Sequence, residues 1–284
     1  MEAESDSDGK HYPPVTGIDR DEHVGMVREI FATITGRYDF LNHLLSLRRD
    51  IAWRRFTIRK MKFFKTFRLL DVATGTADLA IEAAKGHPGI HVVGIDFVKE
   101  MLALGRQKIA RRGLLDRIDL LQADAISLPF PDRSFDAAGI AFGIRNMPDR
   151  LGALREMRRV IVPGGQVFVL DMNSPQSRLW RGFFTPYLNR ILPAIARRFS
   201  GNPSAYLYLV DSITHFPKPP AFLALMEEAG FRTVERYPLT FGITSLYIGS
   251  IAGGEENPLD RKENACQDRH AGPCFVTSDG KKRT

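Results

Sequence analysis

The chain has 284 residues, of which 44% are hydrophobic and 26% are charged, so its composition is that of a globular protein and excludes disorder of the whole chain. No stretch approaches the roughly 18 uncharged apolar residues that a membrane span needs, and the acidic first residues do not resemble a secretory signal. The two cysteines, Cys266 and Cys274, lie near the C-terminus, where they cannot hold a core together. We therefore expect a cytoplasmic protein without a structural metal site.

The net charge of +7 is concentrated on residues 23–254, because residues 1–22 are acidic and residues 255–284 carry equal numbers of acids and bases. A body this basic favours polyanionic partners, which are nucleic acid or the anionic headgroups of a bilayer. Composition alone leaves both partners open.

Helical and strand patterns alternate along residues 21–252, between two tails, 1–20 and 253–284, that we expect to be disordered. This alternation predicts an α/β fold with a mostly parallel, seven-stranded sheet and helices on both of its faces. We assign residues 176–215 to an insertion that serves as a lid or contacts the acceptor. The expected helices lie near residues 24–34, 53–58, 78–85, 97–112, 151–160 and 220–229, and the expected strands at 68–72, 91–96, 117–122, 135–140, 166–171, 233–237 and 245–251.

Three successive strands end in a turn or an acid that could bind a nucleoside. The segment from Asp71 to Asp78 is rich in small residues and lets the backbone approach a ligand. Asp96 ends the second strand, where an acid can accept the hydroxyls of a ribose, and Asp124 follows the third, near an adenine amine. Each feature alone could be structural, as a turn or as a helix cap at Asp96. Their order at one edge of a sheet favours an adenosine site.

A nicotinamide dinucleotide is the first competitor for such a site. Its fingerprint needs three glycines after the first strand, and only Gly75 is present. None of the seven tyrosines is followed four residues later by lysine, the pair that a short-chain dehydrogenase needs. Hydride transfer is therefore disfavoured.

These motifs resemble those of class I S-adenosylmethionine-dependent methyltransferases, and four further segments resemble the ubiquinone/menaquinone biosynthesis C-methyltransferase family more narrowly. The resemblance covers about residues 20–250, and the Phe-Gly-Ile-Arg-Asn run is specific to that family. The four segments are Arg37-Tyr38-Asp39-Phe40-Leu41-Asn42, Trp53-Arg54-Arg55-Phe56-Thr57, Phe142-Gly143-Ile144-Arg145-Asn146, and Ser212-Ile213 onward to Glu228-Ala229-Gly230-Phe231.

The resemblance implies a Rossmann-like class I fold, S-adenosylmethionine as cosubstrate and no metal. The implied reaction is methyl transfer to a ring carbon of a polyprenylated quinol, either demethylmenaquinol or the methoxy-benzoquinol precursor of ubiquinone. Ala141 replaces a frequent serine, which removes a side-chain hydrogen bond. Ala77 replaces a usual glycine, which is tolerable if its φ angle is negative. The implied cosubstrate-binding positions are Asp71, Gly75, Thr76, Asp96, Asp124, Ala125 and Ala141.

A ring carbon is a poor nucleophile until an adjacent hydroxyl loses its proton, so the site must remove that proton or stabilise the phenolate. His43 and His215 are isolated signals, which are more often structural than catalytic. Arg145 is the better candidate, as a fixed cation that stabilises the phenolate while water carries the proton away. Tyr38 and Asn146 would orient the ring. The alternative is that Arg145 pairs structurally with a nearby acid.

Residues 178–198 interleave aromatic, aliphatic and arginine residues, which indicates a lid, contact with lipid, or both. We expect a polyprenyl quinol and an anionic membrane surface as partners, on the inner face of the membrane, with a homodimer as a further expectation and no nucleic acid. Nucleic-acid methylation stays the alternative from the charge, although the Asn/Asp-Pro-Pro-Tyr/Phe motif of amine methylation is missing after the fourth strand. A non-catalytic, cosubstrate-binding scaffold in a quinone-synthesis complex is a third hypothesis.

Overall fold

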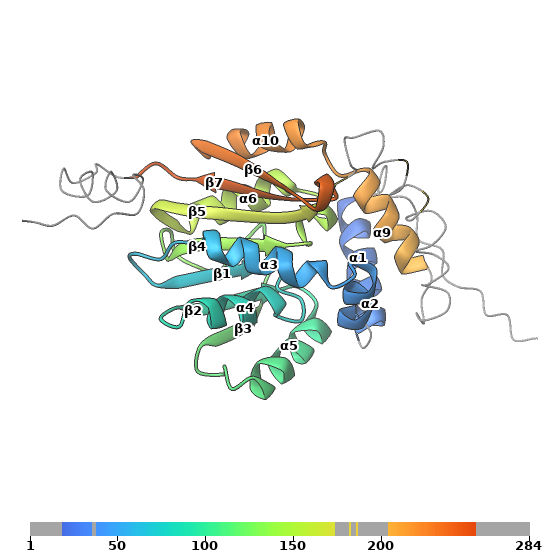
Figure 1. Cartoon of the computed structure of the whole chain (residues 1–284), viewed down its shortest axis with the longest axis horizontal. Coiled ribbons are helices and arrows are strands. Elements are labelled where there is room, and N and C mark those ends of the chain that lie inside the picture. Colours follow the sequence, from blue (N-terminus) through green and yellow to red (C-terminus); the bar gives the residue numbers. More distant parts are fainter. Residues whose placement is uncertain (1–18, 36–37, 174–181, 183–185, 187–203, 254–284) are drawn as a thin grey trace, which may run out of the picture. The chain divides into compact units, whose positions relative to one another are not determined.

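A computed structural model describes residues 19–35, 38–173, 182, 186 and 204–253 of the chain. Its seven strands form one sheet in the order β3-β2-β1-β4-β5-β7-β6 (Figure 1). Strands β1 to β5 pair in parallel, whereas β7 is antiparallel to both β5 and β6. The strands are β1 (Arg68–Val72), β2 (His91–Asp96), β3 (Ile118–Gln122), β4 (Phe135–Ala141), β5 (Ile161–Met172), β6 (Thr233–Leu239) and β7 (Thr244–Ser250). The expected fold class is confirmed.

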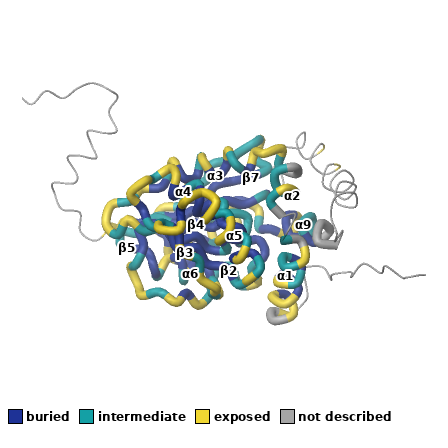
Figure 2. The backbone as a smooth tube through the Cα atoms, turned by 90° about the horizontal axis from the view of Figure 1, so that it is seen from below, coloured by how far each residue is buried: buried dark blue, intermediate teal, exposed yellow. Residues whose placement is uncertain are grey.

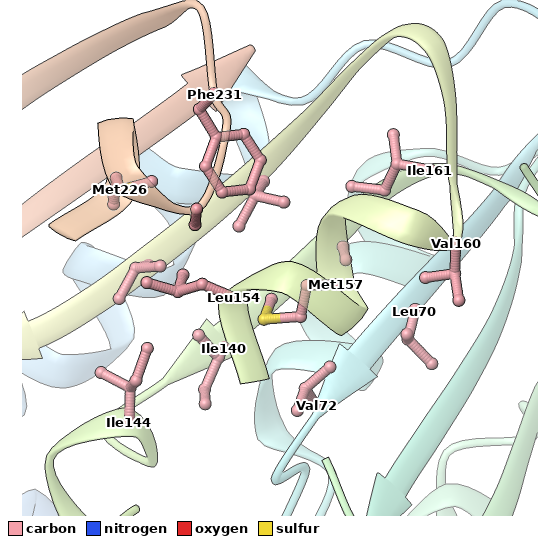
Figure 3. Close-up of a cluster of buried hydrophobic side chains, with 14 of the residues drawn as sticks. Leu70, Val72, Ile140, Ile144, Leu154, Met157, Val160, Ile161, Met226 and Phe231 are labelled. Atoms are coloured by element: carbon pink, nitrogen blue, oxygen red, sulfur yellow. The ribbon is translucent and has the colours of Figure 1, made fainter. Parts of the chain in front are cut away.

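The central strands are buried on both faces, and successive side chains pack into two different cores. In β1, Leu69 belongs to one cluster and Leu70 to the other; Val92 and Val93 of β2 divide in the same way. This follows from the two-residue period of a strand. Figure 3 shows one of the clusters, where side chains of the helix after β4 pack onto the sheet. A sheet covered on both faces in this way needs near-continuous apolar strands, which the sequence provides.

Helices cover each face of the sheet. On one face lie α3 (Arg49–Lys60), α4 (Asp78–Gly86) and α5 (Lys99–Arg111), whose apolar residues join the cluster of Leu69. On the other lie α6 (Arg150–Arg159) and α10 (Pro219–Glu228), which contribute Leu154 and Met226 to the cluster of Leu70. Figure 2 shows the buried backbone of the strands between these partly exposed helices.

Three further helices gather at one end of the sheet in Figure 1: α1 (Arg20–Ile34), α2 (Tyr38–Leu45) and α9 (Ser204–Thr214). The first was expected. Neither α2 nor α9 was predicted from the sequence, because α2 is short and α9 falls inside the segment assigned to an insertion. None of the helices in the described ranges is long and apolar enough to cross a bilayer.

Strand β5 is longer than the expected 166–171, because it begins at Ile161 and runs through Pro163, Gly164 and Gly165. The pairing register between β4 and β5 shifts near this point. A Cβ at Gly165 would lie 2.5 Å from the carbonyl oxygen of Asp136, so this position needs glycine for close packing of the two strands. These three residues therefore form an irregularity inside the strand.

Candidate functional site

The strand order places a crevice beside β1, because the chain proceeds from β1 to β2 on one side and returns to β4 on the other. Ligands of open parallel sheets bind at such a switch point, at the carboxyl ends of the strands. The loop after β1 lies at this place. Its backbone is pinned to the next strand by a hydrogen bond from the Thr74 N–H to the Ile95 carbonyl oxygen, 2.9 Å long.

Asp71 organises that loop from beneath. Its Oδ2 accepts hydrogen bonds from the Thr74 hydroxyl at 2.6 Å and from the Ala80 N–H at 3.1 Å. The side chain is almost completely buried, and burial raises the pKa of Asp71 to about 7. Asp71 is absent from the lining of the two clefts that open at this edge. The geometry therefore gives it a supporting place, one layer below the expected cosubstrate contact.

The loop contains left-handed residues at Ala73, Gly75 and Ala77, with φ angles of 50°, 57° and 66°. A negative φ, the condition under which alanine would be tolerated at position 77, is not met. Ala77 precedes α4 and is fully buried, so its methyl group is held in a conformation that favours glycine. The loop therefore holds backbone strain at the point where it turns into the helix.

Asp96, at the end of β2, faces the loop directly. Its Oδ2 accepts the Gly75 N–H at 2.8 Å, and its Oδ1 accepts the Val98 N–H at 2.9 Å. The bond from Val98 is the helix-capping contact considered from the sequence. The bond from Gly75 ties β2 to the loop, so a capping role does not exclude a place in the site. Burial raises the pKa of Asp96, opposed by these backbone hydrogen bonds.

Two adjoining clefts open above this edge, and they share Val27, Ala73, Asp96, Phe97, Asn146 and Met147. One cleft extends to the loop after β3, and the other to the end of β4. Together they bring six of the predicted site residues to one place, namely Gly75, Asp96, Asp124, Ala125, Ala141 and Asn146.

The lining of the clefts fits an adenosine. Most lining side chains are apolar, among them Ala73, Ile95 and Phe97, and they suit the faces of a purine. Carboxylates of Asp96 and Asp124 stand at the ends of two neighbouring strands, where they can accept hydroxyl and amine protons. The residues present therefore match the polar and apolar parts of such a ligand.

Helix α1 covers this edge, a role that sequence analysis missed. Val24 and Val27 line the first cleft, and Val27 and Phe31 line the second. The helical spacing of these apolar residues was the one sequence signal for this role. A helix that precedes the first strand does not connect two strands of the sheet, so its apolar side can cover the sheet's edge. Val24 remains 37% exposed, which suits a residue that borders an open cleft.

Thr76 lies outside both clefts and takes part in a polar network instead. Its hydroxyl donates to Asp39 at 2.6 Å and accepts from the Lys108 ammonium group at 3.0 Å. Lys108 also binds Asp39 and Asp78. The network joins α2, the loop, α4 and α5. Thr76 thus fixes the loop, and its expected direct contact with the cosubstrate is not supported by its position.

The two histidines considered from the sequence have structural partners. His43 contacts Asp50 at 2.9 Å, and Asp50 also pairs with Arg54. Burial alone would raise the pKa of Asp50, but hydrogen bonds from Ser46 and His43 and the charge of Arg54 lower it. His215 contacts Asp211, one turn earlier in its own helix.

Arg145 lies in the short 3-10 helix η2 (Ile144–Asn146), directly after β4. One guanidinium nitrogen donates to Asp171 Oδ1 at 2.7 Å, and the Arg145 N–H donates to Asp171 Oδ2 at 3.2 Å. Both side chains are buried, so the pairing with an acid considered as the alternative is present. The guanidinium keeps one unused hydrogen-bond donor, because its Nε is buried without a hydrogen-bond partner among the described residues.

Asn146 and Tyr38 are the other two residues expected to orient the acceptor ring. Asn146 follows Arg145 and lines both clefts. Tyr38 begins α2, but its side chain lies outside the described part of the structure. The segment 178–198 also lies outside the described residues, except for Gly182 and Pro186.

Two buried residues near Arg145 were not found from the sequence. His23 of α1 and Tyr208 of α9 are 4% and 5% exposed, and His23 Nε2 lies 3.4 Å from the Tyr208 hydroxyl. They are 185 positions apart. No motif links them, and only the meeting of α1 with α9 brings them together. Within the described ranges, no group of three or more His, Cys, Asp or Glu side chains could hold a metal ion.

Solved structures that align with this chain include a methyltransferase and a cyclase. A SAM-dependent methyltransferase from Aquifex aeolicus aligns with a TM-score of 0.51 at 18% identity, over 70% of this chain and 89% of that one. The cyclase SpnF aligns with a TM-score of 0.53 at 19% identity, over 72% and 81% of the two chains. At these identities the likeness shows the fold alone.

Sequence comparison is more specific. The chain is 44% identical over 224 residues to the ubiquinone/menaquinone biosynthesis C-methyltransferase UbiE of Geotalea daltonii, covering 78% of this chain and 95% of that protein. It is also 44% identical over 237 residues to the demethylmenaquinone methyltransferase of Deinococcus radiodurans, covering 84% and 96%. A family model matches residues 18–251, which include every strand and both clefts. The strand-end acids, the cleft that they share and this match together place the chain in the ubiE/COQ5 methyltransferase family.

Proposed function

We propose that the chain transfers a methyl group from S-adenosylmethionine to a ring carbon of a polyprenylated quinol, as the names of its relatives indicate for those proteins. The observation that carries the proposal is the convergence of Asp96, Asp124 and Asn146 on one pair of adjoining clefts. An adenosine bound there lies close to Arg145, the residue before Asn146. Arg145 is the candidate for activating the acceptor.

Asp96 would accept the ribose hydroxyls, since each of its oxygens has lone-pair capacity beyond the backbone hydrogen bond that it already accepts. Asp124 and the adjacent Ala125 would contact the adenine. Gly75 would let the loop approach the ligand closely, because a side chain is absent there. When bound, S-adenosylmethionine supplies an electrophilic methyl carbon attached to a positively charged sulfur.

Arg145 would stabilise the acceptor as a phenolate. A guanidinium stays protonated, so Arg145 acts as a fixed positive charge and a hydrogen-bond donor. Asp171 holds it in place from behind through one terminal nitrogen, which leaves Nε available. Such prearranged donors commonly contribute about 100-fold or more to a rate. Asn146 and Tyr38 would orient the ring against the methyl carbon.

The test is methyl transfer from labelled S-adenosylmethionine to demethylmenaquinol and to a 2-methoxy-6-polyprenyl-1,4-benzoquinol. We expect transfer to at least one quinol and none to RNA or DNA. Arg145→Gln should lower turnover about 100-fold while cosubstrate binding, measured by calorimetry, stays within a few-fold. The matched control is Arg155→Gln, an exposed arginine of α6. Cosubstrate binding without transfer to either quinol would favour the scaffold hypothesis instead.

We further propose that the chain docks on anionic membrane to reach its prenylated acceptor. The turn from α2 to α3 exposes Leu47 by 80%, and Phe40 of α2 is exposed by 57%. Leu47 has a φ of 50°, which is costly for a branched residue. Arg48 and Arg49 follow directly and are exposed. Apolar side chains beside cations suit the interface of a bilayer that contains anionic lipids.

Cosedimentation with vesicles of anionic and of zwitterionic lipid tests this docking. We expect binding to the anionic vesicles only, and Leu47→Glu should weaken it several-fold. Leu115→Glu is the matched control, because Leu115 is 61% exposed but lies between α5 and β3. Equal binding of both variants and the parent would contradict this docking surface while leaving the methyl-transfer proposal intact.

A further inference from the structure

A buried polar cluster lies next to the clefts, since His23, Arg145 and Arg150 directly adjoin three lining residues, Val24, Asn146 and Asp149. Its members come from four elements: His23 on α1, Arg145 on η2, Arg150 on α6 and Tyr208 on α9. Helix α9 packs against η2, which brings Tyr208 toward the arginines. The charges of Arg145, Arg150 and Asp211 all act on the Tyr208 hydroxyl. Arg145 and Asn146 are consecutive, so this cluster begins one residue from the cleft.

The cluster holds two hydrogen-bond donors with nothing to donate to. The Nε atoms of Arg145 and Arg150 are both buried and have no partner among the described residues. The other contacts of these arginines fix them in place: Arg145 pairs with Asp171, and Arg150 donates to the Arg145 carbonyl oxygen at 2.9 Å. Unsatisfied buried donors on cations are costly, and they are expected where an acceptor atom of a ligand enters.

His23 and Tyr208 make a hydrogen-bonded pair beside these donors. Their rings meet edge to face, with centroids 6.4 Å apart, and His23 Nε2 faces the Tyr208 hydroxyl. Burial, with the charge of Arg150, lowers the pKa of His23 below its usual value near 6.5. The imidazole is therefore neutral at pH 7 and has a nitrogen that can accept a proton. The pair thus combines a proton acceptor with a hydroxyl that can relay a proton.

We infer that Tyr208 and His23 form the proton-accepting pair for the ring hydroxyl of the acceptor, with the Nε atoms of Arg145 and Arg150 holding the oxygen that remains. This inference rests on the proposed function. It identifies a proton acceptor, a role that Arg145 cannot fill because its guanidinium stays protonated. Tyr208 would contact the acceptor hydroxyl, and His23 would act through it.

The proposed steps balance in protons and electrons. The acceptor O–H bond breaks, its proton passes to Tyr208, and the Tyr208 proton passes to His23 Nε2; the electron pair stays on the phenolate oxygen between the arginines. The ring carbon forms a bond to the methyl carbon as the carbon–sulfur bond breaks, and that electron pair goes to sulfur. The same ring carbon then loses its hydrogen to water, and His23 returns its proton to the oxygen through Tyr208. One proton is released in total.

The charged and titratable groups around His23 are few among the described residues. Tyr208 faces it from α9, the charge of Arg150 acts on it from α6, and Asp19 directly precedes its own helix. Arg145 and Asp211 act on Tyr208, its hydrogen-bond partner. A loss of the histidine should therefore change one ionisation in the rate profile.

The test compares the pH dependence of methyl transfer in the parent with that in His23→Gln and Tyr208→Phe. The parent rate should rise with pH and level off above the lowered histidine pKa. His23→Gln should lose about 100-fold at pH 7 and gain about tenfold per pH unit up to pH 9, because only acceptor that is already ionised reacts. Tyr208→Phe should lose at least about tenfold. His91→Gln is the matched control, since His91 is partly exposed at the start of β2 and pairs with the exposed Asp119 of β3.

Calorimetric binding of S-adenosylmethionine to each variant separates a chemical defect from misfolding, and an unchanged Kd is expected. A His23→Gln enzyme with the parent's rate and pH profile overturns the inference. If the parent methylates no quinol, the proposed function fails. A probe phenol then tests separately whether the cluster takes the proton of a bound hydroxyl. We expect the absorbance of bound 1-naphthol to report a pKa at least about one unit below that of free naphthol, with the shift lost in His23→Gln. An unshifted naphthol also overturns it.

Discussion

The proposed cosubstrate side, at the clefts, and the proposed acceptor side, at the buried cluster, are built on different principles. On the cosubstrate side, Asp96 and Asp124 lie at the ends of neighbouring parallel strands, and their carboxylates accept hydrogen bonds from nearby backbone N–H groups, those of Gly75, Val98 and Ile126. On the acceptor side, Arg145, Asp171 and Tyr208 come from distant elements and form a buried set of charges and hydroxyls. The first side is fixed by sheet geometry, and the second depends on partners that must all be present.

The difference predicts that the acceptor side is the more fragile. Removal of the acid in Asp171→Ala leaves the Arg145 charge buried and unpaired, which should cost about 3–5 kcal/mol of unfolding free energy. Urea unfolding followed by circular dichroism measures it. The matched control is Asp132→Ala, whose exposed pairing with Arg159 should be worth less than about 1 kcal/mol. Equal losses in the two variants would remove the distinction between the two sides.

The pH dependence of stability sharpens the comparison on the cosubstrate side. The pKa of Asp71 is raised to about 7 in the folded chain and lies near about 4 when unfolded, so the folded state keeps a proton that the unfolded state releases. The contribution of Asp71 to stability is therefore fully present below pH 4, falls as the pH rises to about 7, and is constant above.

Asp71→Asn cannot ionise and keeps an acceptor for Thr74 and Ala80. Its unfolding free energy relative to the parent should therefore rise by about 2–4 kcal/mol between pH 4 and pH 8. Urea titrations of both proteins at a series of pH values check this. A difference that does not change with pH would mean that Asp71 ionises in the folded chain as it does in the unfolded one.

Cosubstrate affinity tests the ribose contact. Asp96→Ala should raise the Kd for S-adenosylmethionine about 30-fold, because hydrogen bonds to a charged group contribute about 1.5–3 kcal/mol. Isothermal calorimetry measures the Kd. Asp119→Ala, which removes an exposed acid of the neighbouring strand β3, serves as the control and should leave the Kd unchanged. Binding that survives the loss of Asp96 would place the ribose elsewhere.

The smallest expected effect is a gain. Ala141 ends β4 and lines the second cleft without offering a polar side chain. Ala141→Ser would add a hydroxyl at this edge, and one hydrogen bond of about 1 kcal/mol corresponds to roughly a fivefold lower Kd for the cosubstrate. The same calorimetric titration detects it. A Kd that rises in Ala141→Ser would indicate that the cleft has no room for the hydroxyl.

More of the residues that line the clefts than of those in the buried cluster could be picked out from the sequence. Asp96 and Asp124 follow recognisable strands, and parallel strands bring their carboxyl ends to one edge whatever the loops do. Thr76 shows the limit even there, because a residue in the right loop can turn toward Asp39 and Lys108 instead of the cleft. The φ of Ala77 shows a second limit, since a sequence does not reveal the sign of a backbone angle.

The alternation of apolar runs and small-residue turns by itself determined the sheet, its helical covering and the edge at which the two clefts open, because these follow from local periodicity and chain direction. Only the tertiary structure decided which side chains meet across long separations: Arg145 with Asp171, and His23 with Tyr208. Such meetings depend on how helices pack at the end of the sheet. No spacing along the chain encodes them, because the free energy of burial is set by all the elements that exclude water together.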